Sequence, residues 1–465
     1  MNTILVGLII YILVQFVIGL LAVRHSDNET DFILAGRGLG PLLGSFTVFA
    51  TWFGAESVIG AAGNIYENGL SGSSSDPFGY GLCLIILGCV YAVPLWRSKY
   101  TTFGDFFRER FSSKVEKFFV LLVVPSSIFW SAAQVRAFGQ IVSVISDVDV
   151  ELAISGAAVL IIVYTMIGGM RATAVTDLIQ GIGLMVGLII LFVFIIKAAG
   201  GIGPSIEQVP LDRIKLNTDT SLLHIIERWA VPICGATLAA ESIARILATR
   251  SENTARFSAI TGGLLYIFVG FIPLYIGLVG PELISGLEDP EQIVPSLAKE
   301  YLSTFFYILF CGALVSAILS TVDSAVLAAA SLISHNVVVP LKKDISDKGK
   351  VTVVRISVVV IGLIAYYFAI NAEGVYELIY TAVAFGTAGV FVVGTLGLFT
   401  GIGDQYSAFA GFIAGSGLWV IGEYLVNWET PYLFALAGAA TAYLLVAVIE
   451  RMYQKNNLKA LDITE

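Results

Sequence analysis

The sequence predicts an all-α polytopic membrane protein, and three observations lead to that prediction. Of its residues 57% are hydrophobic and only 13% are charged, whereas a soluble domain carries about 25% charged residues. Its mean hydropathy is +0.86. Apolar stretches recur along the whole chain, and many reach the ~20 residues that a helix needs to cross a bilayer. The connections leave no room for a soluble domain, so residues 1–465 are expected to form a single transmembrane transport domain.

Thirteen transmembrane helices are expected from these apolar stretches. In chain order they cover residues 3–23, 40–62, 77–96, 118–145, 151–169, 173–197, 222–247, 257–280, 302–335, 352–371, 375–399, 406–427 and 432–450.

Charged residues in the connections predict the orientation of these helices. The connections at 97–117 and 342–355 are rich in lysine and arginine, whereas 67–76 and 146–151 contain neither, and 280–299 is acidic. Basic connections stay on the cytoplasmic side of a membrane. With an odd number of spans, the N-terminus is expected outside and the C-terminus in the cytoplasm, in the inner or plasma membrane of the cell.

Helix breaks recur with an offset of five spans. Gly54 lies between small and polar neighbours in the second span, and the stretch 231–237, which contains Pro232, offers a second break in the seventh. The same offset separates the span that contains Asp177 from the glycine-rich stretch 385–389. Transporters often bind solute and ions at helices that unwind near the midplane. We expect two halves of five helices, the second inverted: an extra helix at 3–23, repeats at 40–197 and 222–399, and two C-terminal helices at 406–450.

Small and hydroxyl side chains on the ninth span predict a sodium site. Residues 317, 320, 321 and 324 follow i, i+3, i+4, i+7 spacing and share one helix face, and Asp323 flanks them. Na⁺ is a hard cation that prefers oxygen ligands. Hydroxyls in membrane helices also bond to their own preceding turn, but the neighbouring acid favours an ion site. The predicted sodium ligands are Ala50, Phe53, Ala317, Ser320 and Thr321.

Asp177 is an acid inside a membrane span, which is costly and marks an ion or substrate pathway by default. Thr173 and Gln180 share its helix face. Three readings stay open: a second cation ligand, a proton carrier, or an acid paired with Arg136 or Arg245. The residues predicted for a possible second cation are Asp177, Asp323 and Ser324.

Two of these stretches resemble a known family. Residues 168–180, Gly-Gly-Met-Arg-Ala-Thr-Ala-Val-Thr-Asp-Leu-Ile-Gln, resemble the signature of the sodium:solute symporter family. Residues 320–324 resemble its sodium-site helix. The resemblance implies the leucine-transporter type of fold, Na⁺ as the coupling ion, and a shared Na⁺ site at the five positions given above. It also implies that some members bind a second Na⁺ at the positions of Asp177, Asp323 and Ser324.

Shorter stretches are similar to the high-affinity choline transporter branch of that family, at 50–52, 77–80, 128–133 and 141–149. By this likeness Trp52, Tyr80 and Trp130 match three positions of an aromatic cage, which holds a quaternary ammonium by cation–π attraction. The position of the fourth cage aromatic is Ala239.

Polar side chains near the cage positions depart from that branch. An ammonium group would pair with an acid or a ring, and a carboxylate would pair with the guanidinium of Arg136. A bridge from Arg136 to Glu241 or Glu56 is the alternative. The residues predicted to bind solute are Trp52, Glu56, Tyr80, Trp130, Gln134, Arg136 and Glu241.

We therefore expect a sodium-coupled symporter that imports a small polar organic solute by alternating access. The solute classes are an amino acid, a quaternary or other amine, or an organic acid. Proton coupling in the same fold is the alternative, and a solute sensor or channel is a weaker one. The sequence shows no nucleophile–base pair, metal-ligand cluster or nucleotide loop, so no enzyme is expected. The expected partners are Na⁺, the solute and the lipid bilayer, with no nucleic acid and no cofactor.

Overall fold

The protein is almost entirely helical. The computed structural model describes residues 3–22, 28–146, 148–216, 221–342, 344–372 and 375–462. Within these ranges, nine helices are long and apolar enough to cross a membrane, and two bent helix pairs raise the number to eleven. The prediction of an all-α polytopic protein is confirmed at this level. The segment 141–149, one of the four similar to choline transporters, extends over residue 147, which lies outside the described residues.

The first half of the chain forms the helices α1 to α9. Their bounds are α1 Thr3–Ala22, α2 Glu29–Leu34, α3 Pro41–Trp52, α4 Ala61–Asn68, α5 Tyr80–Ile86, α6 Ala92–Arg97, α7 Phe103–Arg110, α8 Ser113–Ser146 and α9 Val150–Ala198. Several junctions are π-helical turns, which occur often at functional sites. These turns are Glu56–Gly60, Ser74–Gly79 and Leu87–Tyr91.

The second half forms α10 to α21. Their bounds are α10 Ile202–Gln208, α11 Leu211–Ile214, α12 Leu222–Thr237, α13 Ala240–Leu247, α14 Glu252–Leu283, α15 Ile293–Tyr301, α16 Thr304–Leu332, α17 Asp347–Asn371, α18 Val375–Ala384, α19 Thr387–Phe399, α20 Gln405–Val420 and α21 Pro431–Asp462. A π-helical turn, Ile333–Val338, continues α16 without a gap.

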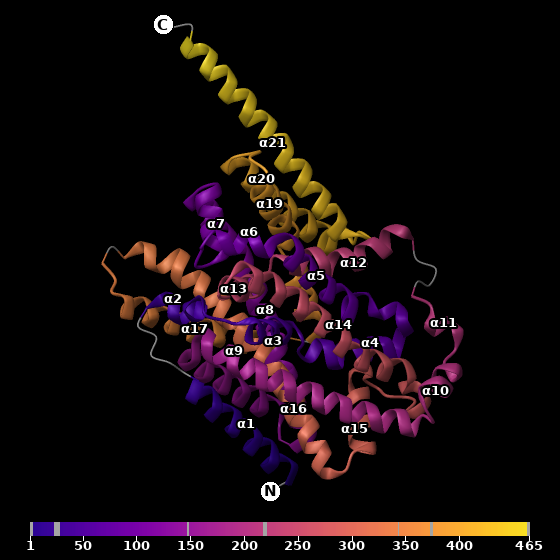
Figure 1. The fold of residues 1–465 in the computed structure, drawn as a ribbon. Helices are drawn as coiled ribbons and strands as arrows, with labels where there is room; N and C mark the ends of the chain where they lie inside the picture. Colours follow the sequence, from indigo (N-terminus) through magenta and orange to yellow (C-terminus); the bar gives the residue numbers. More distant parts are fainter. Residues whose placement is uncertain are drawn as a thin grey trace.

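Helix α16 forms the centre of the molecule and packs against α8 and α9. Its residues from Phe310 to Leu332 are all buried. Figure 1 shows α10, α11 and α15 at one end of the body and α2 and α7 at the other, with α21 projecting from the rest. The outer face of α9 exposes Ile182, Val186, Ile189 and Val193, an i, i+4, i+7, i+11 stripe that suits contact with lipid.

The second glycine of the 168–180 signature, Gly169, forms a kink in α9. This helix contains 49 residues, and Gly169 inside it has φ 59° and ψ −178°, a conformation that is almost confined to glycine. A Cβ at Gly169 would lie 2.8 Å from the Phe32 carbonyl oxygen of α2. The break falls between the two predicted spans 151–169 and 173–197.

A side chain at Gly169 is expected to destabilise the protein. Gly169→Ala combines an unfavourable backbone conformation, which costs about 1–3 kcal/mol, with the contact to the Phe32 carbonyl. The expected result is a lower apparent melting temperature of the detergent-purified protein. Gly156→Ala is the matched control on the same helix, because a Cβ there meets no atom within 4 Å. Equal melting temperatures for the two variants would contradict this account of Gly169.

Two helix pairs are broken near their middle. The segments Pro41–Trp52 and Glu56–Ser73 meet at 62°, and Phe53 between them has φ −84° and ψ 76°, so the break lies where Gly54 predicted it. Leu222–Thr237 and Ala240–Leu247 meet at 44°. This break directly follows the stretch 231–237 in which it was expected, since α12 continues through Pro232 and ends at Thr237. A membrane helix tolerates a proline when neighbouring groups satisfy the freed carbonyl.

Polar residues at the α2 and α7 end form a connected group, which we call the His335 cluster. His335 Nδ1 lies 3.1 Å from Glu29 Oε2, and its Nε2 lies 3.2 Å from Asp105 Oδ1. The Asn336 amide donates to Glu116 Oε1 at 2.8 Å. Members of the cluster are Glu29, Asp105, Arg108, Glu116, His335 and Asn336. It ties the end of α16 to α2, α7 and α8.

Stability is expected to fall in acid as Asp105 becomes protonated. Burial alone would raise the pKa of the Asp105 carboxyl, but hydrogen bonds from His335 and the Thr102 backbone, with the Arg108 charge, hold it below its usual value. A carboxyl whose pKa is lower in the folded state stabilises the fold at pH values above its unfolded pKa of about 3.9. This stability is lost as the pH falls through the pKa of the folded state. Asp105→Asn should lower the melting temperature at pH 7 and flatten its dependence on pH below about 4. If the melting temperature of Asp105→Asn falls below about pH 4 as steeply as that of the wild-type protein, this role of Asp105 is contradicted.

Candidate sodium and solute site

Hydrogen bonds between their oxygen atoms bring together four of the five residues that were predicted to bind sodium. The Ser320 hydroxyl lies within bonding distance of the carbonyl oxygens of Ala317, 2.8 Å, and Ala50, 3.1 Å. The Thr321 hydroxyl reaches the same two carbonyls, at 3.0 and 3.2 Å. Two hydroxyls from α16 and two carbonyls, one from each helix, therefore converge at the end of α3. Oxygen donors of this kind suit a hard cation.

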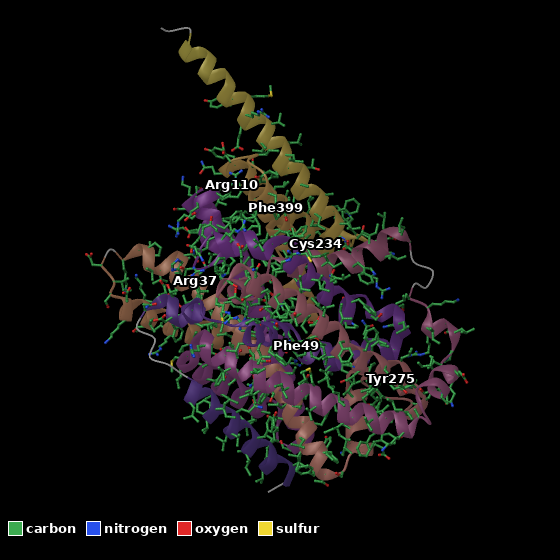
Figure 2. The ribbon with its side chains drawn as sticks, in the orientation of Figure 1. Arg37, Phe49, Arg110, Cys234, Tyr275 and Phe399 are labelled. Carbon is green, nitrogen blue, oxygen red and sulfur yellow. The ribbon has the colours of Figure 1, made fainter. Side chains whose placement is uncertain are left out.

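Phe53, the fifth predicted residue, lies in the turn that ends α3. Its amide still donates to the Phe49 carbonyl at 3.0 Å, and its ring packs on Phe49 with centroids 5.0 Å apart. Figure 2 shows Phe49 near the centre of the molecule. The next residue must be small, because a Cβ at Gly54 would lie 2.8 Å from both Thr321 Oγ1 and Gln134 Oε1. The break of α3 therefore lies directly against α16, at Thr321.

Asp177, Asp323 and Ser324, predicted for a second cation, lie close to this oxygen set. Asp177 Oδ2 accepts a hydrogen bond from the Thr47 hydroxyl, and its Oδ1 has no partner among the described residues. Ser324 Oγ lies 3.4 Å from Asp323 Oδ1. All three side chains are almost fully buried. Arg245 of α13 donates to Ser324 Oγ, so a cationic side chain shares their surroundings.

The aromatic residues predicted to hold solute form one stack. The Trp52 and Tyr80 ring centroids lie 5.4 Å apart at an interplanar angle of 29°, and Trp52 meets Trp130 edge-on at 5.1 Å. Tyr80 donates its hydroxyl to Glu56 Oε1 at 3.0 Å, while the buried Glu56 Oε2 has no hydrogen-bond partner among the described residues. Such a combination of ring faces and a carboxylate is suited to binding an ammonium group.

Gln134, Glu241 and Arg136 are distributed differently around this stack. Gln134 accepts the Ala55 amide at 3.2 Å within the break of the second span. Glu241 lines a small cavity together with Trp52 and Trp130. Arg136 Nη1 donates to the Ala369 carbonyl of α17 at 2.9 Å, and Arg136 is absent from the linings of this cavity and of the larger one described next. The bond to Ala369 directs this guanidinium nitrogen to α17.

A larger cavity, of about 360 Å³, opens beside Glu56. Asp76 also lines it, and Tyr266 donates its hydroxyl to this acid. Toward α15 the lining includes Asp289, Glu291 and Lys299. Burial, and then the neighbouring Asp289 charge, raise the pKa of the Glu291 carboxyl. The cavity therefore extends past acidic groups to Glu56, the acid that accepts the Tyr80 hydroxyl.

Two polar residues of this region were missed as site residues. Asp76 is buried on the cavity wall, whereas the sequence placed it in the connection 67–76, outside the predicted spans. Arg245 had been considered only as a partner for Asp177. It follows Glu241 by four residues, a helical spacing that could have indicated a common face on α13.

The profile of the sodium:solute symporter family matches residues 32–415 of this chain. The chain belongs to the sodium:solute symporter family. One relative, the high affinity choline transporter 1 of Homo sapiens, is 27% identical over 92% of this chain and 77% of its own. The sodium/proline symporter of Escherichia coli (strain K12) is 26% identical over 79% of this chain and 77% of its own.

Solved structures show the fold of this sodium:solute symporter. A substrate-bound, outward-open Na⁺-coupled sialic acid symporter matches with a TM-score of 0.85 and 17% identity, over 96% of this chain and 97% of that chain. Mhp1, a transporter of the nucleobase-cation-symport-1 family, matches with a TM-score of 0.63 and 14% identity over 92% and 95%. Family and fold together make the protein a multi-pass membrane transporter that couples import of a small organic solute to Na⁺.

Proposed function

We propose that this symporter binds Na⁺ where α3 breaks against α16, and imports a small organic amine by alternating access. The observation that carries the proposal is the convergence of the Ser320 and Thr321 hydroxyls on the carbonyls of Ala50 and Ala317. An ion there would bond to the end of α3 and to α16 at once, with the carbonyl of Phe53 as a further ligand. Binding of ion and solute would then be reciprocal, each tightening the other by the same factor.

The solute is proposed to present an ammonium group to Glu56 and the Trp52–Tyr80–Trp130 stack. Glu56 keeps one carboxylate oxygen without a described partner, and the cavity beside it is lined by further acids. The names of the relatives, choline and proline transporters, include both an amine and an amino acid. An amino acid would require the Arg136 guanidinium to leave the Ala369 carbonyl, so an amine without a carboxylate fits these contacts better.

We also propose that the chain crosses the membrane thirteen times. The count takes α9 as two spans that meet at Gly169, joins each broken pair into one span, and includes α1. The two inverted five-helix repeats at 40–197 and 222–399, with the N-terminus outside and the C-terminus inside, complete the proposal. Figure 1 is consistent with it, because α10, α11 and α15 lie at the end opposite to α2 and α7.

Cysteine labelling tests this orientation. Lys215→Cys is expected to react with a membrane-impermeant maleimide in intact cells, while Lys348→Cys is expected to react only after the membrane is opened. Both positions are exposed in the structure, so each can be labelled wherever the reagent reaches it. The reverse pattern would contradict the proposed orientation, and labelling of both positions in intact cells would contradict the proposed number of spans between them.

Thermal stabilisation tests the proposed function directly. A ligand that binds only the folded protein raises its apparent stability by mass action. NaCl is expected to raise the melting temperature of the purified protein above that in equal KCl or choline chloride, and the solute is expected to enlarge the shift when Na⁺ is present. Equal shifts in NaCl and KCl would contradict sodium coupling and favour the proton-coupled alternative.

A further inference from the structure

One buried cation is left unexplained by the sodium and solute sites. Arg245 of α13 is fully buried, with 0% of its surface exposed. Its Nη2 donates to Ser324 Oγ, whereas its Nε and Nη1 have no hydrogen-bond partner among the described residues. A guanidinium remains charged in a protein, and a buried charge requires a compensating charge nearby.

Two acids supply the opposite charge from neighbouring helices. Asp177 of α9 and Asp323 of α16 are both buried, and both interact electrostatically with Arg245. Thr47 donates to Asp177 Oδ2, and Thr173 Oγ1 lies 3.4 Å from Asp323 Oδ2. The second oxygen of Asp177 has no described hydrogen-bond partner. No ion pair within 4 Å links Arg245 to either acid in the part of the chain that the structure describes. The guanidinium therefore attracts both acids without forming a direct ion pair with either.

This charged group adjoins the sodium oxygens. Ser324, which accepts from Arg245, follows Ser320 by one turn and donates back to its carbonyl at 2.7 Å. Thr51 Oγ1, next to Ala50 in sequence, lies 3.5 Å from Ser324 Oγ. One helical turn therefore separates the Arg245 contact from the hydroxyls proposed to hold Na⁺.

The charges balance with a single ion. Two carboxylates and one guanidinium leave one negative charge, which one Na⁺ at the Ser320–Thr321 oxygens neutralises. A second Na⁺ beside Asp177 and Asp323 would place three cations against two acids in a buried region. A third acid, Glu241, also interacts electrostatically with Arg245, but it lines the small cavity beside Trp52, so its charge is assigned to the solute site.

We propose that the Arg245 guanidinium takes the place of a second coupling cation between Asp177 and Asp323, so that each molecule binds a single Na⁺. The inference rests on the proposed function, because it takes the Ser320–Thr321 site as the place of that ion. It assigns Arg245 a role as a built-in cation that sets the number of ions coupled to each solute.

Equilibrium binding of ²²Na⁺ to the purified full-length protein counts the ions without requiring the solute. The wild-type protein is expected to bind a single Na⁺ per molecule. Arg245→Gln is expected to admit a second Na⁺, because it frees Asp177 and Asp323, whereas Arg245→Lys, which keeps the charge, is expected to stay at a single ion. Adding Asp177→Asn to Arg245→Gln should remove the second ion. A second Na⁺ in the wild-type protein, or none gained by folded Arg245→Gln, overturns the inference.

A second pair of variants keeps the inference testable if Arg245→Gln does not fold. Asp177→Asn alone is expected to keep the single Na⁺ at lower affinity, since it removes the negative charge that the ion neutralises but none of the ion's proposed oxygens, whereas Ser320→Ala with Thr321→Ala is expected to lose it. Binding of two Na⁺ by the wild-type protein and of one by Asp177→Asn overturns the inference and leaves sodium coupling intact. Failure of the wild-type protein to bind any Na⁺ contradicts the proposed function itself, so the two failures are distinguishable.

Discussion

Replacing Ser320 and Thr321 together with alanine is expected to raise the Na⁺ concentration for half-maximal uptake by about 100-fold. Each hydroxyl is proposed to contribute one oxygen to the ion, and a contact with a charged group is worth about 1.5–3 kcal/mol. Since 1.4 kcal/mol is tenfold in affinity, two lost ligands give at least this change. The measurement is Na⁺-dependent uptake in proteoliposomes, together with the Na⁺-induced rise in melting temperature.

Ser331→Ala provides a control on the same helix. Ser331 is buried like Ser320 and Thr321, but its hydroxyl bonds only to the Leu327 carbonyl of its own turn, at 2.6 Å. Its removal is expected to leave the Na⁺ requirement unchanged. If the double variant folds and keeps the wild-type Na⁺ dependence, the two hydroxyls do not hold the ion, and their bonds to Ala50 and Ala317 only join α16 to α3.

Glu56→Gln is expected to weaken the binding of an amine solute by about 10- to 100-fold. The amide has nearly the same shape and can still accept the Tyr80 hydroxyl, so the aromatic stack should be preserved. What is lost is the negative charge opposite the ammonium group, and a hydrogen bond to a charged group is worth about 1.5–3 kcal/mol. The measurement is the concentration of the transported amine for half-maximal uptake at saturating Na⁺, with choline and proline as competing probes.

Glu291→Gln is the matched control for that experiment. Glu291 lines the same cavity near its α15 wall, and it has no contact with the aromatic stack among the described interactions. We expect its replacement to change the half-maximal concentration by less than about threefold, as for a partly solvated charge. An equal effect of both variants would indicate that the cavity attracts cations by its total charge, and that Glu56 does not bind the ammonium directly.

The sequence was sufficient to predict which oxygen atoms converge where α3 ends against α16, the place proposed for Na⁺. The spacing of residues 317–324 on a helix places the hydroxyls of Ser320 and Thr321 on one face, and this holds for any regular helix. Gly54 among polar neighbours predicted the break that brings the carbonyl of Ala50 to the same place. Both predictions depend on local geometry, which a sequence determines well.

The environment of the charged side chains was harder to predict. Arg136 and Arg245 were equal candidates to pair with Asp177, because charge type alone does not say which helix faces which. In the structure Arg136 donates to the Ala369 carbonyl of α17, while Arg245 interacts with Asp177 and Asp323. The break in the seventh span was predicted within 231–237, but Pro232 does not mark it: α12 continues to Thr237, because a membrane helix tolerates a proline where neighbouring groups satisfy the freed carbonyl.

The continuity of α16 has a mechanical consequence. From Thr321 to His335 the chain stays helical through the junction with the π-helical turn, a length of about 21 Å at 1.5 Å per residue. A continuous helix of this length transmits a shift from one end to the other, so the oxygens proposed to bind Na⁺ and the His335 cluster are expected to move together. Acid that protonates Asp105 would weaken the contacts of this helix at its far end. The pH on that face of the membrane would then adjust how readily the ion leaves, without any proton being transported.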